Sequence, residues 1–301
     1  MLRQNYGFVL KSIKKDRSLK PVKENLLNKT YIVSGGTRGI GFNIAEKLLK
    51  KGANVVIIGK TSVPHPRLEE TIFTAAAKLR ANTVYPSSKV YGMVCDIRNK
   101  EEIDKVIEDT INITGKIDGA VLNASALCLN NTLNQTEKEV KLMSSVNING
   151  TYLFGQKCLQ YMNYNKEGHM LVISPPIEML NTDEWWVPNL YYSMSKFNMS
   201  LMAKFWNKEF PKIGINTLWP RTTINTAPVR NLLGGEEMLN ISRTPDIMGD
   251  AACHIFHSNP KICNGKNFID DEVLVSLDKD VENYRVNFDV KEKDLMPDFF
   301  C

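Results

Sequence analysis

Residues 30–41, with the sequence TYIVSGGTRGIG, decide the fold, because a short apolar strand leads directly into a glycine-rich turn. Gly35 allows a tight turn out of the strand, Gly39 lets the backbone approach a pyrophosphate, and Gly41 lets the next helix pack close to the sheet. Backbone amides at the start of that helix would then face the phosphates. Such a turn alone is equally typical of a plain strand-to-helix connection, but here an amphipathic helix also follows it. The stretch predicts a dinucleotide-binding turn.

From residue 30 onward, short β-branched runs alternate with segments of helical periodicity, which is the pattern of a parallel sheet covered on both faces. Strands are expected at 30–34, 54–58, 90–95, 118–122, 169–173, 215–218 and 267–269, and helices at 40–51, 68–81, 100–113, 136–161, 191–209 and 245–258. The sequence therefore predicts an α/β fold of a single domain, with a doubly wound, Rossmann-type parallel sheet of seven strands. Ligands bind such sheets at the carboxyl ends of the strands.

Charge is distributed unevenly along the 301 residues, of which 43% are apolar and 24% charged. The formal net charge is +5, but residues 1–29 contain eight Lys or Arg and two acids, so this basic arm carries the positive charge. The rest of the chain has no basic excess with which to bind nucleic acid. We divide the chain into a basic arm at 1–29, the dinucleotide-fold domain at 30–270, and a polar tail at 271–301 that is expected to lie over the domain.

The arm is interpreted either as an amphipathic transit sequence or as a solvated extension. The transit interpretation places the protein in the mitochondrion, with the peroxisome and the cytoplasm as alternatives. The arm has no regular pattern long enough to dock, so removal of residues 1–24 is expected to leave folding unchanged. No apolar run reaches the roughly 20 residues that span a bilayer, so no integral membrane segment is expected.

The cysteines and histidines give no sign of a metal site. Six cysteines occur without a C-x-x-C pair, which predicts free thiols. His254 and His257 lie three residues apart, and no third ligand is near them in the sequence. No metal is expected.

The choice between NAD and NADP depends on the end of the second strand. An NAD site normally presents an acid about 20 residues after the glycine turn. Here residues 59–62 read GKTS, and no Asp or Glu occurs between Glu46 and Glu69. Lys60 and Arg38 are instead placed to meet a 2′-phosphate, which predicts NADP(H). Asp96, just after the third strand, is placed either to hydrogen-bond an adenine amino group or to cap the next helix.

A second motif, Tyr192-Ser193-Met194-Ser195-Lys196, lies at the start of a predicted helix. Residues four apart share a helix face, so Tyr192 and Lys196 are neighbours. A buried ammonium stabilises a phenolate, so we expect Lys196 to lower the pKa of Tyr192 from ~10. Tyr192 would then serve as general acid and base for an alcohol or carbonyl oxygen, and Lys196 would also hold the nicotinamide ribose.

Together these motifs resemble those of the short-chain dehydrogenase/reductase family. The turn at 35–41, the run Leu122-Asn123-Ala124-Ser125 and the Tyr192 and Lys196 pair match the family pattern, and the match covers roughly residues 28–270. The resemblance implies an NADP-dependent oxidoreductase, with Tyr192 as proton donor and acceptor and Asn147 as the helix-kinking member of a proton relay. The cofactor residues it implies are Gly35, Gly36, Thr37, Arg38, Gly39, Ile40, Gly41, Lys60, Asp96, Asn123 and Lys196.

Three positions depart from that family pattern. Leu122 stands where a second Asn is usual, Pro175 where the catalytic Ser is usual, and Arg221 where a Gly follows proline. Ser174 is the nearest hydroxyl to the serine position, and we expect it to take over that role imperfectly, by polarising the substrate oxygen. Some relatives carry a C-terminal sterol-carrier-like lipid domain, and this chain is expected to work without one.

Apolar residues in two loops indicate the substrate class. The loops at 177–190 and 224–241 carry, among others, Met179, Trp185, Trp186, Ile224, Leu232 and Leu233. They would line a pocket for a lipid-like carbonyl, retinoid or steroid, or else pack as an ordinary lid or as a contact in a homo-oligomer. An alternative to the enzyme is a weakly active or non-catalytic dinucleotide-binding sensor or scaffold in lipid metabolism, which the loss of the serine motivates.

Overall fold

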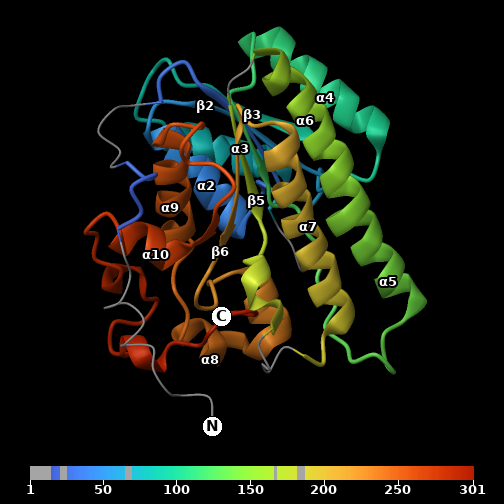
Figure 1. Ribbon diagram of the computed structural model, residues 1–301, viewed down its shortest axis with the longest axis vertical. Helices are drawn as coiled ribbons and strands as arrows, with labels where there is room; N and C mark the ends of the chain where they lie inside the picture. The colour runs from blue at the N-terminus through green and yellow to red at the C-terminus, as the bar shows by residue number, and fades with distance from the viewer. Residues whose placement is uncertain (1–14, 21–25, 65–69, 166–167, 182–186) are drawn as a thin grey trace.

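The computed structural model describes residues 15–20, 26–64, 70–165, 168–181 and 187–301 as one α/β unit (Figure 1). The strands are β1 (Thr30–Ser34), β2 (Asn54–Gly59), β3 (Val90–Val94), β4 (Gly119–Leu122), β5 (His169–Ile173), β6 (Gly214–Trp219) and β7 (Asn267–Ile269). All neighbouring strands pair in parallel, in the order β3-β2-β1-β4-β5-β6-β7. The predicted seven-stranded, doubly wound sheet is confirmed.

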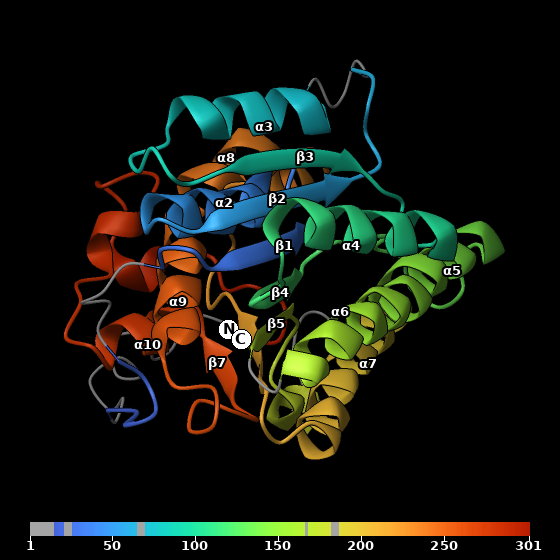
Figure 2. The ribbon, with the colours of Figure 1, turned by 90° about the horizontal axis from the view of Figure 1, so that it is seen from above.

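Helices cover both faces of the sheet, as Figure 2 shows from above. They are α2 (Gly39–Lys50), α3 (Ile72–Ala81), α4 (Lys100–Thr114), α5 (Glu137–Met143), α6 (Thr151–Asn165), α7 (Leu190–Glu209), α8 (Gly235–Asn240), α9 (Asp246–His257) and α10 (Asp270–Val275). Successive β1 residues alternate between two cores: Tyr31 and Val33 pack with α2, α3 and α9, and Ile32 packs with α4, α6 and α7. Burial on both faces explains why the strands read as continuous apolar runs.

One predicted helix is divided. The segment expected as a single helix at 136–161 begins as α5, continues as a π-helix over Ser144–Gly150, and resumes as α6. Asn147 lies in the middle of the π-helical segment with its side chain fully buried. Because a π-helix adds one residue to the hydrogen-bonded turn, it changes which side chains face the sheet.

The basic arm is not free of the domain, contrary to the expectation from sequence. Leu19 and Leu26 belong to the buried core, and the backbone N–H of Lys20 donates to Ser258 Oγ at 3.0 Å. The expectation that residues 1–24 do not dock is therefore wrong for the described residues 16–20. Within this segment Leu19 is buried without any regular apolar pattern around it.

The tail at 271–301 crosses the carboxyl end of β6. The Trp219 Nε1–H donates to the Phe299 carbonyl at 2.6 Å, and both Phe299 and Phe300 are buried. Arg221, which replaces the usual glycine, is buried and binds Asp271 through Nε at 2.7 Å. The guanidinium thus ties the end of β6 to α10, at the start of the tail.

Two further features of the described chain concern membranes and metals. None of the helices in the described residues combines the length and apolar character that a membrane span requires. Within the same residues there is no group of three or more His, Cys, Asp or Glu that could hold a metal ion.

Candidate active site

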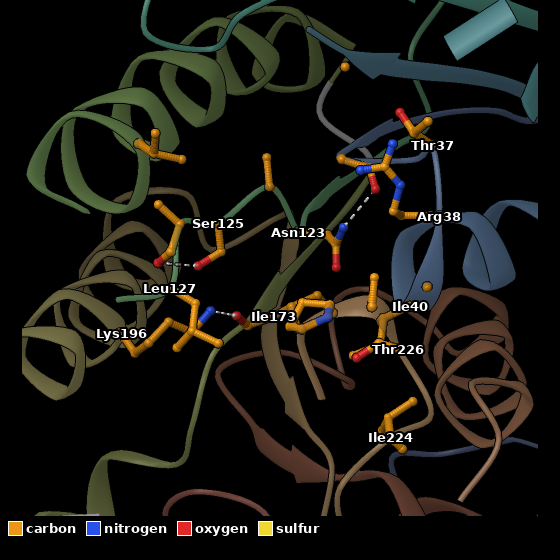
Figure 3. A pocket seen from close by; sticks show the side chains of 18 of the residues that line it. Thr37, Arg38, Ile40, Asn123, Ser125, Leu127, Ile173, Lys196, Ile224 and Thr226 are labelled. Carbon is orange, nitrogen blue, oxygen red and sulfur yellow. Dashed lines mark hydrogen bonds between the residues drawn. The ribbon is translucent and has the colours of Figure 1, made fainter. Parts of the chain in front are cut away.

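A cavity of about 710 Å³ lies along the carboxyl edge of the sheet. It is lined by residues that follow five strands, among them Gly35, Lys60, Asp96 and Asn123 at one end and Tyr192, Lys196 and Trp219 at the other. Figure 3 shows this division, with Thr37 and Arg38 on one side and Lys196 beside Ile173 on the other. We call the first part the cofactor end and the second the reacting end. The edge of the sheet thus brings together segments that lie far apart in the sequence.

The glycine turn at the cofactor end depends on Asn123. Its Nδ2 donates to the carbonyls of Ser34 at 3.0 Å and Gly35 at 3.1 Å. Gly35 has a φ of +65°, and a Cβ on Gly41 would lie 2.4 Å from the same Asn123 nitrogen. Any side chain at position 41 would clash with Asn123 and break these hydrogen bonds. The glycine turn and Asn123 therefore form one structural unit. Asn123 fixes the shape of the turn and also lines the cavity.

The structure divides the predicted cofactor residues into two groups. Those lining the cavity are Gly35, Thr37, Arg38, Gly39, Ile40, Lys60, Asp96, Asn123 and Lys196. Gly36 and Gly41 do not line it, because Gly36 packs against Ile57 and Gly41 against Asn123 and the Gly35 carbonyl. The absence of a side chain at Gly36 and Gly41 therefore lets the turn pack closely against its neighbours.

The two predicted phosphate ligands differ in their surroundings. Lys60 is exposed at the rim of the cavity. Arg38 Nη2 donates to the Glu70 carbonyl at 2.7 Å, and its Nε lies 4.0 Å from the Glu70 carboxylate without any hydrogen bond among the described residues. A donor that is half-buried and unused fits a ligand with several acceptor oxygens. Glu70, which sequence reasoning missed, competes for the same guanidinium.

Asp96 does not cap α4. The cap is Asn99, whose side chain accepts from the backbone N–H groups of Glu101 and Glu102. Asp96 instead accepts from Arg98 Nε at 2.9 Å, and the hydrogen bonds and charge of Arg98 hold the pKa of Asp96 below its ordinary value. Of the two alternatives, the cap is therefore wrong. Arg98 also lines the cavity and was missed, because an Asp-x-Arg run has no distinctive sequence signal.

Tyr192 and Lys196 meet at the reacting end as their spacing predicts. Both lie on α7 and line the cavity, with exposed fractions of 7% and 2%. Lys196 Nζ donates to the Ile173 carbonyl at 2.6 Å and lies 5.0 Å from the centre of the Trp219 ring. Burial lowers the pKa of Lys196 to about 7, and the negative charge of Asp298 opposes that shift.

The expected lowering of the Tyr192 pKa is not found. Burial raises the pKa of Tyr192 above its ordinary value, and the negative charge of Asp298 raises it further. Lys196 cannot offset this, since desolvation weakens its own hold on the proton. Tyr192 is consequently a neutral phenol over the ordinary pH range, with a proton to give.

Aromatic side chains of the tail surround Tyr192. The Phe299 ring meets it edge-on at 5.5 Å between centroids, and the Phe300 ring stacks at 6.4 Å. Phe299 and Asp298 also line the cavity. Sequence analysis assigned the tail no role in the site, although the pair of phenylalanines at the end of a polar segment was a usable signal of docking.

Asn147 lies beside the site but does not line the cavity. Its Oδ1 accepts from Ser125 Oγ at 3.0 Å and the Ala126 N–H at 2.7 Å, and its Nδ2 donates to Ala126 O and Ser195 Oγ. The side chain joins the end of β4 to α7. A part in a proton relay stays a prediction.

Ser174 is not brought together with Tyr192. Its side chain is fully buried, its Oγ has no hydrogen-bond partner among the described residues, and it does not line the cavity. The neighbouring Pro175 carbonyl accepts from Ser200 Oγ at 2.6 Å, which fixes this stretch against α7. The proposed substitute for the serine is therefore turned into the protein, because side chains alternate in direction along an extended chain.

Of the two predicted substrate loops, the second reaches the cavity. Ile224, Leu232 and Leu233 line it, whereas Leu180 and Val187 of the first loop are exposed. Trp185 and Trp186 lie outside the described residues.

Comparisons with known proteins agree with this geometry. The model of the short chain dehydrogenase family matches residues 29–231. The chain is 38% identical over 272 residues to the hydroxysteroid dehydrogenase-like protein 2 of Bos taurus and to that of Homo sapiens; the match spans 90% of this chain and 63% of each relative. A putative dehydrogenase from Xanthomonas campestris has a similar structure, with a TM-score of 0.82, 34% identity, and coverage of 93% of this chain and 99% of that one. A short chain dehydrogenase from Mycobacterium thermoresistibile superposes with a TM-score of 0.80 at 35% identity, covering 91% and 95%.

Proposed function

The chain belongs to the short-chain dehydrogenase family, and from that premise we propose that it is an NADP(H)-dependent reductase of an apolar, lipid-like carbonyl. One observation carries the proposal: a single cavity runs from the glycine turn, with Arg38 and Lys60, to Tyr192 and Lys196. The cofactor, when bound, supplies the hydride. Gly35, Thr37, Arg38 and Lys60 would hold its phosphates.

The residues of the reacting end favour reduction over oxidation. Tyr192 is a neutral phenol, so it can give its proton to a carbonyl oxygen as that oxygen gains negative charge. In the oxidative direction Tyr192 would have to act as a phenolate, which its burial and Asp298 disfavour. Ile224, Leu232 and Leu233 would exclude water and contact an apolar substrate.

The test is NADPH oxidation, followed by absorbance, with decanal, decan-2-one and a steroid ketone as probes. We expect turnover of at least one probe, and a lower KM for NADPH than for NADH. Stabilisation of the protein by NADPH against heat, without turnover of any probe, would contradict the reductase.

A dinucleotide-binding sensor is the second candidate. Two observations favour it. The Ser174 hydroxyl is buried away from the cavity, so it cannot contact a substrate there. The rings of Phe299 and Phe300 pack around Tyr192. Binding of NADPH without turnover is the outcome it predicts. We further propose a mitochondrial location from the basic arm, which imaging of the arm fused to a fluorescent reporter would test.

A further inference from the structure

The cavity continues beyond the glycine turn to the carboxyl end of β3. In the sheet order, β3 lies at one edge and β6, which ends at Trp219, lies on the far side of β1, so the two parts of the cavity flank the glycine turn. A dinucleotide with its phosphates at the turn and its reacting ring toward Tyr192 would therefore place its adenine at the end of β3. The residues there that line the cavity include Asp96, Ile97 and Arg98.

Two kinds of side chain meet at this part of the cavity. Ile58, Cys95 and Ile97 line it and are buried, which gives it an apolar surface. A Cβ on Gly150 would lie 2.9 Å from Ile97 Cγ1, so Ile97 is packed tightly against the π-helical segment. Arg98 also lines the cavity, but its side chain is 40% exposed. A flat aromatic ring bound here would thus meet buried apolar groups and a guanidinium at the rim.

The Arg98 guanidinium is held along one edge by Asp96. Its Nε donates to Asp96 Oδ1 at 2.9 Å and to Oδ2 at 3.0 Å, and its Nη2 donates to Oδ2. The backbone N–H of Arg98 donates to Oδ1 at 3.0 Å, so the same carboxylate fixes both the start and the end of the side chain. Because these donors are engaged, the planar faces of the guanidinium remain for a ligand. Guanidinium planes stack on nucleic-acid bases and other aromatic rings.

We propose that Arg98 binds the adenine ring of the cofactor through the face of its guanidinium, and that Asp96 holds the guanidinium in place. The inference rests on the proposed function only for the identity of the ligand, and it requires no turnover. The charges favour the base over a phosphate. Arg98 and Asp96 together are neutral, and the Asp96 carboxylate would repel a phosphate that approached the pair. Lys60 stays the ligand proposed for the 2′-phosphate.

The test compares the affinities of dinucleotides that differ at one group. Fluorescence titration of the full chain gives the Kd of NADPH, of NADH and of reduced nicotinamide hypoxanthine dinucleotide, which lacks the adenine amino group. Arg98→Lys keeps the charge opposite Asp96 and removes the planar group, so it should weaken the binding of all three by about threefold to tenfold. Arg80→Lys is the matched control, since Arg80 is exposed on α3 and does not line the cavity. It should leave the three Kd values unchanged.

Three other results for Arg98→Lys would overturn the proposal. A loss confined to NADPH would mean that Arg98 contacts the 2′-phosphate. A loss for NADPH and NADH, but not for the hypoxanthine dinucleotide, would mean that Arg98 acts only by orienting Asp96 toward the amino group. Unchanged affinities, or a wild type that binds none of the three, would also overturn it. If the wild type binds NADPH but turns over no carbonyl probe, the proposed reductase fails, while these affinities still decide the role of Arg98.

Discussion

The two ends of the cavity are built differently. The cofactor end is built around one continuous glycine turn, which the amide of Asn123 shapes, and Lys60 and Asp96 join it from the ends of two neighbouring strands, with Lys60 exposed to solvent. The reacting end is assembled from α7, β6 and the tail, and Tyr192 and Lys196 are almost completely buried in it. The central element of the first end is a local sequence motif. The second exists only when three distant segments have packed together.

The two ends also differ in what shifts the pKa values of their charged groups. At the cofactor end the hydrogen bond from Arg98 is the largest influence on the pKa of Asp96 and lowers it, and partial burial lowers the pKa of Arg38. At the reacting end desolvation is the largest influence on Tyr192, Lys196 and Asp298. Changes at the two ends should therefore alter different measured quantities: cofactor affinity at one, and rate and pH dependence at the other.

The largest effect is expected from a substitution at the reacting end. Tyr192→Phe removes the proton donor and should lower kcat for decanal by about 10² to 10⁴-fold, while the Kd for NADPH stays unchanged. Tyr191→Phe is the matched control, because that hydroxyl bonds Ser144 outside the cavity. Steady-state kinetics and fluorescence titration of NADPH measure the two quantities. An equal loss in both variants would mean that the assignment of Tyr192 is wrong.

The next effect concerns how the tail is held. Arg221→Met leaves Asp271 with fewer partners in a buried position and should lower the free energy of unfolding by about 3 kcal/mol. Urea denaturation gives the value. Lys15→Met, which breaks an exposed pair with Asp278, should leave the unfolding midpoint nearly unchanged. A small loss for Arg221→Met would show that the tail docks through its aromatic residues alone.

The cofactor end and the sheet could be predicted from sequence because their signals are local. A strand, a glycine turn and a helix follow each other within residues 30–50, and the position of Lys60 at the end of β2 follows from strand periodicity. The spacing of Tyr192 and Lys196 also predicts that they share a helix face. In each case the relevant contact lies within one element or between an element and its neighbour.

The surroundings of the catalytic pair could not be predicted in this way. Burial raises the pKa of Tyr192, with Phe299 and Phe300 packed around its ring, and the charge of Asp298, more than 100 residues further along the chain, raises it further. Glu70, which contacts Arg38, precedes α3 and has no motif of its own. Long-range packing decides these contacts, and the local sequence patterns around each residue do not identify its partners.

A smaller effect is expected at the cofactor end, on the affinity for NADPH. Lys60→Ala should weaken NADPH binding by about tenfold to a hundredfold and leave NADH binding nearly unchanged, since only NADPH carries a 2′-phosphate. Glu70→Gln removes the carboxylate that lies 4.0 Å from Arg38 Nε, leaves the hydrogen bond to the Glu70 carbonyl in place, and should strengthen NADPH binding by about twofold. Both are measured by fluorescence titration. Equal weakening for the two cofactors would place Lys60 at a shared phosphate instead.

The smallest expected effect is at Ser174, and it bears on how this chain manages without the family serine. The Ser174 hydroxyl lies in the protein interior, with no partner among the described residues and no access to the cavity. An unpaired buried hydroxyl contributes no hydrogen bond, so Ser174→Ala should leave kcat within about twofold of the wild type and should not lower stability. Ser125→Ala is the informative comparison, because Ser125 lines the cavity and bonds Asn147. Kinetics with decanal and urea denaturation of both variants measure the outcome. A loss of about 10² in kcat for Ser174→Ala would show that the serine turns toward the substrate during turnover. In that case the reacting end would rearrange when it is occupied, and the contrast with the preformed cofactor end would be larger still.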